Sequence, residues 1–259
     1  MTTLDFPLRK KNNQKISMIT CYDSTFAKLV SNSDIDCILI GDSCSMVMHG
    51  NSTTIPATTQ MIEFHTKAVS STCKNKFIVA DMPFLTTRQG KDFATNQAGK
   101  LIIAGANAVK IEGIIGQEDI ILHLIQSGIP VMSHLGLTPQ FYNSFGGHKR
   151  QGKTEESVIK IKEEAKKAEE LGCFAIVLEC IPTELAKEIS ESVNIPTIGI
   201  GSGPYCDGQV LVLQDVLGLG DLKPKFVHNF LNGSELVLNA FNQYAKEVSN
   251  NSFPHKENY

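Results

Sequence analysis

The sequence contains no apolar run near the ~18 residues that span a membrane, so we expect no transmembrane helix. Its N-terminal stretch, MTTLDFPLRKKNNQKIS, is charged and has no apolar segment of the kind found in secretory signals. An excess of basic residues is also missing, because 24 Lys and Arg stand against 27 Asp and Glu, for a net charge of -3. That balance argues against nucleic acid as a partner, since phosphate binding requires a basic surface.

A disulfide framework is absent as well. The seven cysteines are an odd number, and no Cys-x-x-Cys pair occurs. Three of them, Cys37, Cys173 and Cys180, lie in or beside apolar runs, as buried free thiols do. We therefore expect a protein of a reducing compartment, the cytoplasm.

What the sequence does contain is enough apolar material for a large core. Hydrophobic residues make up 42% and charged residues 20%, which excludes wholesale disorder. Eight short apolar runs, bounded by Gly, Pro or polar residues, have the composition of buried parallel strands. They begin near residues 16, 36, 76, 107, 129, 174, 195 and 209.

Stretches with helical spacing separate most of these runs. The clearest begins at Thr154, carries two glutamates in its first turn and ends at Gly172. Others begin near residues 58, 91, 117, 183 and 233. Alternating strands and helices fit both a closed eight-stranded barrel and an open doubly wound sheet. The count of eight, a length near the ~250 residues typical of such barrels and the lack of an internal linker favour one (β/α)₈ TIM barrel domain over residues 1–259.

Ionisable side chains stand at the C-terminal ends of five apolar runs. In a parallel barrel this end is the catalytic face. Residues at i and i+2 share a strand face, so each of these side chains is expected to continue an apolar column. The ionisable residues are Asp42, Asp81, Lys110 with Glu112, His134 and Glu179, and the predicted columns are Ile38-Ile40-Asp42, Phe77-Val79-Asp81, Ala108-Lys110-Glu112 and Ala175-Val177-Glu179.

These residue types suit a magnesium-dependent reaction. Asp42, Asp81 and Glu112 offer the hard oxygen ligands that Mg²⁺ prefers, whereas zinc would require more His and Cys. Lys110 supplies a positive charge, and His134 is a hydrogen-bond donor or proton carrier. Glu179 is left as a carboxylate able to act as a general base.

Eight blocks of sequence then resemble one enzyme family, ketopantoate hydroxymethyltransferase, in the same order from about Ile16 to Phe230. They are TCYDSTFA (from Thr20), ILIGDS (from Ile38), VADMPF (from Val79), GANAVKIEG (from Gly105), SHLGLTPQ (from Ser133), FGGHKRQG (from Phe145), LECIPTELAK (from Leu178) and PTIGIGSGPYCDGQVLV (from Pro196).

The resemblance implies a barrel of the phosphoenolpyruvate/pyruvate type and a homodecamer. It also implies Mg²⁺-dependent transfer of a hydroxymethyl group from 5,10-methylenetetrahydrofolate to the 2-oxo acid 3-methyl-2-oxobutanoate. The product, 2-dehydropantoate, would serve the synthesis of pantothenate, the coenzyme A precursor. The implied roles are metal binding for Asp42, Asp81 and Glu112, substrate binding for Asp42, Ser43, Asp81, Lys110 and His134, and proton acceptance for Glu179.

Two rival functions are weighed against this one. A lyase or mutase of the isocitrate-lyase type would carry a Lys-Lys-Cys-Gly-His motif, but no cysteine of this chain is followed by Gly-His. A non-catalytic binder of 2-oxo acids would not need a spare base, so Glu179 beside a complete set of metal ligands favours an enzyme.

Overall fold

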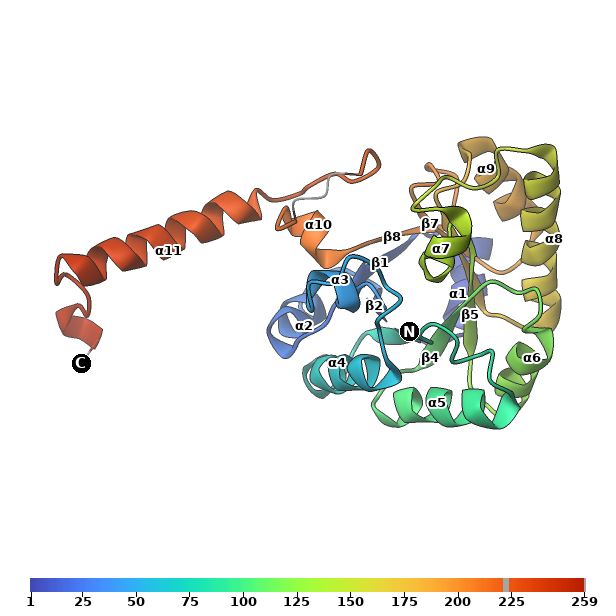
Figure 1. The fold of residues 1–259 in the computed structure, drawn as a ribbon, viewed down its shortest axis with the longest axis horizontal. Coiled ribbons are helices and arrows are strands. Elements are labelled where there is room, and N and C mark those ends of the chain that lie inside the picture. The colour runs from blue at the N-terminus through green and yellow to red at the C-terminus, as the bar shows by residue number, and fades with distance from the viewer. Residues whose placement is uncertain (221–223, 259) are drawn as a thin grey trace. The chain divides into compact units, whose positions relative to one another are not determined.

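A closed parallel barrel is the central feature of the chain. The computed structural model describes residues 1–220 and 224–258. It divides into two compact units, Met1–Val212 and Leu213–Tyr259. The eight strands of the first unit pair in chain order, and β1 closes on β8 (Figure 1). The TIM barrel is therefore confirmed and the open sheet is excluded, while a single domain over residues 1–259 stays a prediction.

Seven strands lie within the predicted apolar runs, and the eighth, β8, begins one residue before its run, at Gly208. Their bounds are β1 (Ile16–Thr20), β2 (Cys37–Ile40), β3 (Phe77–Asp81), β4 (Ala108–Glu112), β5 (Val131–Gly136), β6 (Ala175–Glu179), β7 (Thr197–Ile200) and β8 (Gly208–Leu211).

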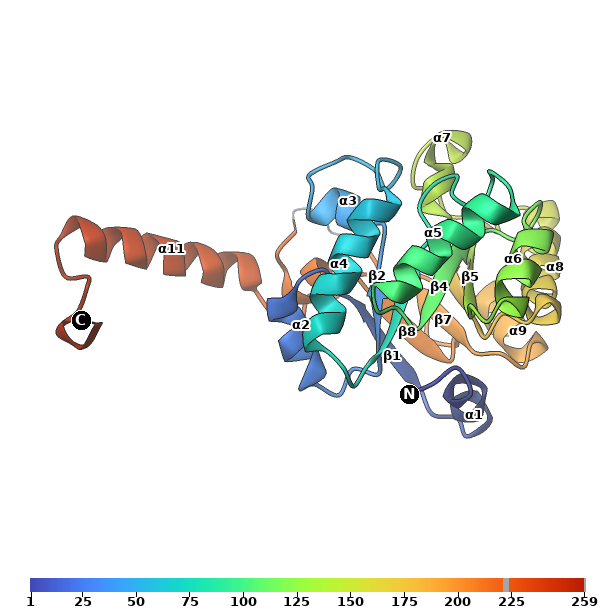
Figure 2. The same ribbon diagram turned by 90° about the horizontal axis from the view of Figure 1, so that it is seen from below.

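Helices surround this barrel (Figures 1 and 2). The longest of them, α8, begins with a capping box between Thr154 and Ser157 and ends at Gly172, whose φ is 92°. That left-handed conformation suits glycine, which has no Cβ to clash with the backbone. The helices of this unit are α1 (Asp5–Lys11), α2 (Ser24–Ser31), α3 (Cys44–Val47), α4 (Thr59–Thr72), α5 (Lys91–Ile103), α6 (Glu118–Gln126), η1 (Pro139–Phe141), α7 (Tyr142–Phe145), α8 (Glu155–Leu171) and α9 (Thr183–Ser192).

The second unit contains α10 (Leu213–Leu217), α11 (Gly233–Ser249) and η2 (Lys256–Asn258). Helix α11 confirms the last helix expected from the sequence. In the described part of the chain, no helix combines the length and the apolar character that crossing a membrane requires.

Helix α1 lies at the N-terminal end of the barrel, opposite α3 and α7 (Figure 2). Its Phe6 is fully buried and meets two rings edge-on, Phe77 of β3 at 5.3 Å and Phe174 beside β6 at 4.8 Å between centroids. Edge-to-face aromatic pairs of this kind add to the free energy gained by burial alone. Phe6 therefore closes the bottom of the barrel core.

Replacing Phe6 by alanine is expected to lower the free energy of unfolding by about 3–5 kcal/mol, because it leaves a cavity among aromatic rings. Denaturant titration followed by circular dichroism measures this loss. The matched control is Leu4→Ala just outside the helix, where the side chain is 80% exposed, and a change within about 0.5 kcal/mol is expected. Equal losses in both variants would show that Phe6 does not close the core.

The barrel core confirms three of the four predicted columns and corrects the fourth. Phe77 and Val79 belong to the core cluster, as do Ala108 of the β4 column and the pair Ala175 and Val177 of the β6 column. In β2, however, the members of that cluster are Cys37 and Leu39. The predicted column Ile38-Ile40-Asp42 is therefore wrong, because Ile38 and Ile40 alternate with the core-facing pair and lie on the other face of β2, which ends before Asp42.

Candidate active site

The C-terminal ends of β3 to β6 bring the predicted ionisable residues together. In the register of the barrel, Asp81 of β3 is the partner of Lys110 of β4, and Glu112 of β4 is the partner of His134 of β5. Glu179 is the last residue of β6. The strand ends thus place these five side chains at one mouth of the barrel, the end that is catalytic in this architecture.

Asp42 reaches the same mouth by a turn after β2. Its backbone N–H donates to Asp81 Oδ2 at 2.9 Å, which joins the β2 loop to the end of β3. Gly41 leaves room for the Ser43 hydroxyl here, because a Cβ at position 41 would lie 2.6 Å from Ser43 Oγ and would displace it. Ser43 follows, half-buried, and its hydroxyl hydrogen-bonds to the phenol of Tyr22 at 2.8 Å.

Lys110 lies at the centre of the cluster. Its ammonium is 3.1 Å from Asp81 Oδ1, 3.9 Å from Glu112 Oε1 and 3.0 Å from His134 Nδ1. An ammonium only donates hydrogen bonds, so Nδ1 of His134 must be the acceptor. The proton of a neutral His134 therefore lies on Nε2, which faces Glu179 Oε2 at 3.2 Å.

Burial and neighbouring charges shift the pKa values of this cluster. Burial, followed by repulsion from Glu112 and Asp81, raises the pKa of Asp42 well above its usual value, and burial raises that of Glu112 to about 7. Burial opposes the charged form of Lys110, but attraction to the acids outweighs it and raises its pKa. Burial and the charge of Lys110 lower the pKa of His134, which favours the neutral ring described above.

Glu179 differs from the other carboxylates in its access to solvent. Its side chain is 16% exposed, against 2–3% for Asp81 and Glu112. One of its oxygens faces His134, and its partial exposure makes Glu179 the carboxylate that a bound molecule can reach most readily. This is the position required of a base that takes a proton from a bound molecule.

The acids of the mouth fit a hard divalent cation. Within the part of the chain that the structure describes, the mouth holds three buried carboxylates, Asp42, Asp81 and Glu112, and one buried ammonium, Lys110. Asp81 Oδ1 and Glu112 Oε1 are buried and, among the described residues, meet charged neighbours without a directed hydrogen bond. No three His, Cys, Asp or Glu side chains within residues 1–220 and 224–258 form a ready-made metal cage. Mg²⁺ does not need one, because it is commonly held by one or two carboxylates plus water and substrate oxygens.

Two buried residues of this site were not predicted from the sequence. Gln140 of η1 hydrogen-bonds to both Asp42 and Glu112, and Tyr22, just after β1, holds Ser43. Both lie in blocks that carry the family resemblance, TCYDSTFA and SHLGLTPQ, and both follow the end of a strand. That placement, rather than charge, is the feature by which the sequence could have revealed them.

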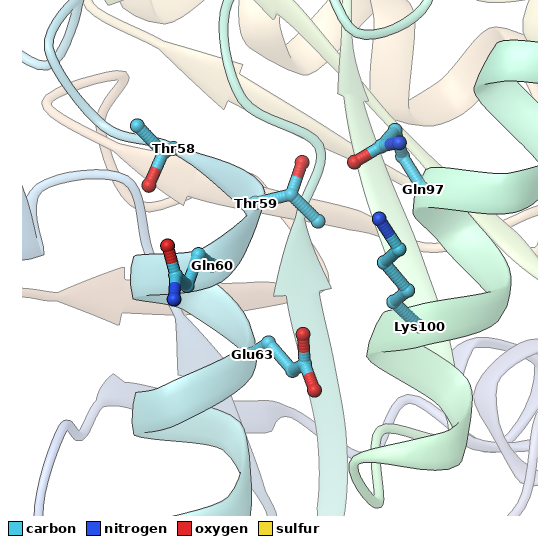
Figure 3. Close-up of a pocket in the computed structure, with 6 residues that line it drawn as sticks. All are labelled: Thr58, Thr59, Gln60, Glu63, Gln97 and Lys100. Atoms are coloured by element: carbon cyan, nitrogen blue, oxygen red, sulfur yellow. The ribbon is translucent and has the colours of Figure 1, made fainter.

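A separate polar hollow of about 420 Å³ lies between α4 and α5 (Figure 3). None of the carboxylates at the barrel mouth lines it, and its own acid, Glu63, already forms an ion pair with Lys67 at 2.8 Å. The chemistry described above therefore belongs to the barrel mouth. The residues lining the hollow are Thr58, Thr59, Gln60, Glu63, Gln97 and Lys100.

Solved structures share the architecture of this chain. A phosphonopyruvate hydrolase in complex with oxalate and Mg²⁺ superposes with a TM-score of 0.64 at 12% identity, covering 97% of this chain and 88% of that one. A 2,3-dimethylmalate lyase of the PEP mutase/isocitrate lyase superfamily gives a TM-score of 0.59 at 13% identity, covering 98% and 89%. At these identities the likeness is one of fold alone.

Sequence relatives are much nearer. The 3-methyl-2-oxobutanoate hydroxymethyltransferase of Francisella tularensis subsp. novicida (strain U112) is 51% identical over 257 residues, covering 99% of this chain and 97% of its own. That of Bdellovibrio bacteriovorus is 51% identical over 260 residues, covering 100% and 99%. The family model for ketopantoate hydroxymethyltransferase matches residues 1–256. The chain therefore belongs to the ketopantoate hydroxymethyltransferase family.

Proposed function

We propose that this chain transfers a hydroxymethyl group from 5,10-methylenetetrahydrofolate to 3-methyl-2-oxobutanoate, forming 2-dehydropantoate for pantothenate synthesis. The single observation that carries the proposal is the connected set at the barrel mouth, in which Lys110 contacts Asp81, Glu112 and His134, and His134 faces Glu179. In this set, Lys110 can bind an anion, Asp81 and Glu112 supply oxygen ligands for a cation, and Glu179 can act as a base, all within reach of one small 2-oxo acid.

Asp42, Asp81 and Glu112 would hold Mg²⁺. When bound, the ion supplies Lewis acidity toward the keto oxygen of the 2-oxo acid. Its double positive charge would also offset the excess of carboxylates over ammonium groups at the mouth. Burial, together with repulsion from Glu112 and Asp81, raises the pKa of Asp42, and burial raises that of Glu112 to about 7, so a divalent cation bound at the mouth would favour the charged form of both acids.

The remaining residues act on the substrate and its proton. Glu179 would accept the proton from C3 of the 2-oxo acid, because it is the most open carboxylate of the cluster. Nε2 of His134 lies 3.2 Å from Oε2 of Glu179 and would orient that carboxylate. Lys110 would stabilise the negative charge that develops as the proton leaves. Ser43, held by Tyr22, would bind the substrate carboxylate.

Lys110→Met is expected to weaken both substrate binding and turnover, because its charge attracts the 2-oxo acid and stabilises the developing anion. Steady-state kinetics measures kcat and KM separately. A rise in KM with kcat unchanged would show uniform attraction of the anion, and unchanged values of both would place Lys110 outside the reaction. Circular dichroism of the variant checks the fold, since the change leaves buried acids without their partner.

The proposed reaction is tested by incubating the protein with 3-methyl-2-oxobutanoate and methylenetetrahydrofolate and following 2-dehydropantoate by mass spectrometry. Product is expected with Mg²⁺, and none after EDTA treatment until Mg²⁺ is restored. Product formed at full rate in EDTA would contradict the metal requirement. Absence of product with the complete mixture would contradict the reaction itself.

We also propose that the chain assembles as a homodecamer, as the family resemblance implies. Helix α11 supports association because the second unit alone leaves its apolar residues Leu238, Phe241 and Tyr244 uncovered. Apolar faces of this kind mark interaction sites. Light scattering on the purified protein is expected to give the mass of ten chains, and the mass of a single chain would contradict the proposal.

A further inference from the structure

Gln140, in the short helix η1 after β5, connects two of the three buried acids. Its side-chain Nε2 donates to Asp42 Oδ2 at 2.9 Å and to the carbonyl of Met82 at 3.0 Å. Its backbone N–H donates to Glu112 Oε2 at 2.9 Å. One residue after β5 thus bonds to segments that follow β2 and β3 and to the end of β4.

The orientation of the Gln140 amide follows from its partners. A carboxylate oxygen and a backbone carbonyl both accept hydrogen bonds, so the NH₂ group must face them. The reversed amide would place its oxygen against two acceptors. Both amide hydrogens are therefore used, and the side chain, in a residue only 9% exposed, has one favourable position.

These bonds occupy one oxygen of each acid, and the second oxygen of Asp81 and of Glu112 faces the Lys110 ammonium. Gln140 occupies Oδ2 of Asp42 and Oε2 of Glu112, and the backbone of Asp42 occupies Oδ2 of Asp81. Oδ1 of Asp81 and Oε1 of Glu112 receive no directed hydrogen bond in the described part of the chain. Each of the three acids is thus held through one oxygen by an amide N–H.

The donor is also neutral, which matters beside a cation site. A lysine or arginine at position 140 would hold Asp42 by charge and compete directly with a divalent ion for it. An amide orients the carboxylate and leaves its negative charge in place. Partners that orient ligating carboxylates in this way commonly change metal affinity by about 10- to 100-fold when they are removed.

We infer that Gln140 is a positioning residue that orients Asp42 and Glu112 toward the divalent cation. The inference rests on the proposed function, since it assumes that these acids hold the ion. Gln140 would thus be an uncharged member of the metal site, located after β5. Its three hydrogen bonds would fix the positions of Asp42, Glu112 and the Gln140 side chain itself.

The test is direct binding of Mn²⁺, a paramagnetic substitute for Mg²⁺, measured by electron paramagnetic resonance on the full chain without substrate. Gln140→Met keeps the size of the side chain and removes both amide hydrogens. Gln140→Asn keeps a polar amide, so this variant should fold even where Gln140→Met does not. Its side chain is too short to bond to Asp42 and Met82 together. Both variants keep the backbone N–H that donates to Glu112 and disturb the bond to Asp42, and through Asp42 they are expected to raise the Kd for Mn²⁺ by about 10- to 100-fold.

The matched control is Ser190→Ala, which removes a buried hydroxyl bonded to Thr197 at 2.6 Å and to the carbonyl of Ala186. It should lower the melting temperature without changing the Kd. Gln140 variants that lose stability but bind Mn²⁺ like the wild type would overturn the inference and leave the proposed function standing. A wild type that binds no Mn²⁺ would overturn the metal-dependent function and the inference together.

Discussion

Glu179→Gln is expected to lower kcat by roughly a hundredfold or more, while the Kd for 3-methyl-2-oxobutanoate changes little. Glutamine keeps the shape of the side chain and the oxygen that faces His134, but it cannot accept the C3 proton. Because the other acids of the mouth are buried, held by amide N–H groups or paired with Lys110, none of them is placed to replace Glu179 as the base. Steady-state kinetics and equilibrium binding together measure the two quantities.

Glu184→Gln is the matched control for this experiment. Glu184 is an exposed acid in the first turn of α9, shortly after Glu179 in the chain. Its replacement changes the net charge by the same amount and should leave kcat unchanged. If the Glu179 variant retained its turnover rate, or if both variants lost it equally, the base would have to be sought elsewhere, first at His134.

Asp81→Asn is expected to lower kcat/KM by at least about a hundredfold and to require far more Mg²⁺ for half-maximal rate. Asp81 is central because one oxygen accepts the backbone N–H of Asp42 and the other lies 3.1 Å from Lys110. The amide retains the volume of the side chain but removes a charge from both the cation site and the Lys110 pair. Titration of the rate against Mg²⁺ measures the effect.

Asp36→Asn provides the control for that change. Asp36 precedes β2 at the opposite end of the barrel, where it forms an ion pair with Arg9 at 2.7 Å. Its loss should affect stability rather than the dependence on Mg²⁺. Full activity of the Asp81 variant in EDTA would exclude a metal ion held by this acid.

The strands and the charged part of the site could be predicted because both follow from burial. Strands covered on both faces need continuous apolar sequence, so an ionisable residue at the end of such a run is conspicuous. Asp81, Lys110, Glu112, His134 and Glu179 were found on that ground, and the barrel places all five at one mouth.

The remaining features depend on where the chain leaves its strands. The column through Ile38 and Ile40 was wrong because Cys37 and Leu39 of β2 face the core instead, and β2 stops before Asp42, so alternation along the strand does not place that acid. Gln140 and Tyr22 are uncharged residues in loops, and their roles come from hydrogen bonds between segments far apart in sequence. Such contacts leave no periodic pattern in the sequence.

Proton exchange at C3 of 3-methyl-2-oxobutanoate, followed by NMR in D₂O without folate, tests the central claim that this carboxylate cluster deprotonates a 2-oxo acid. The wild-type protein with Mg²⁺ is expected to replace the C3 proton by deuterium, and Glu179→Gln is expected to do so at least about a hundredfold more slowly. No exchange above the protein-free rate in the wild type, or exchange at the wild-type rate in the variant, would contradict the claim.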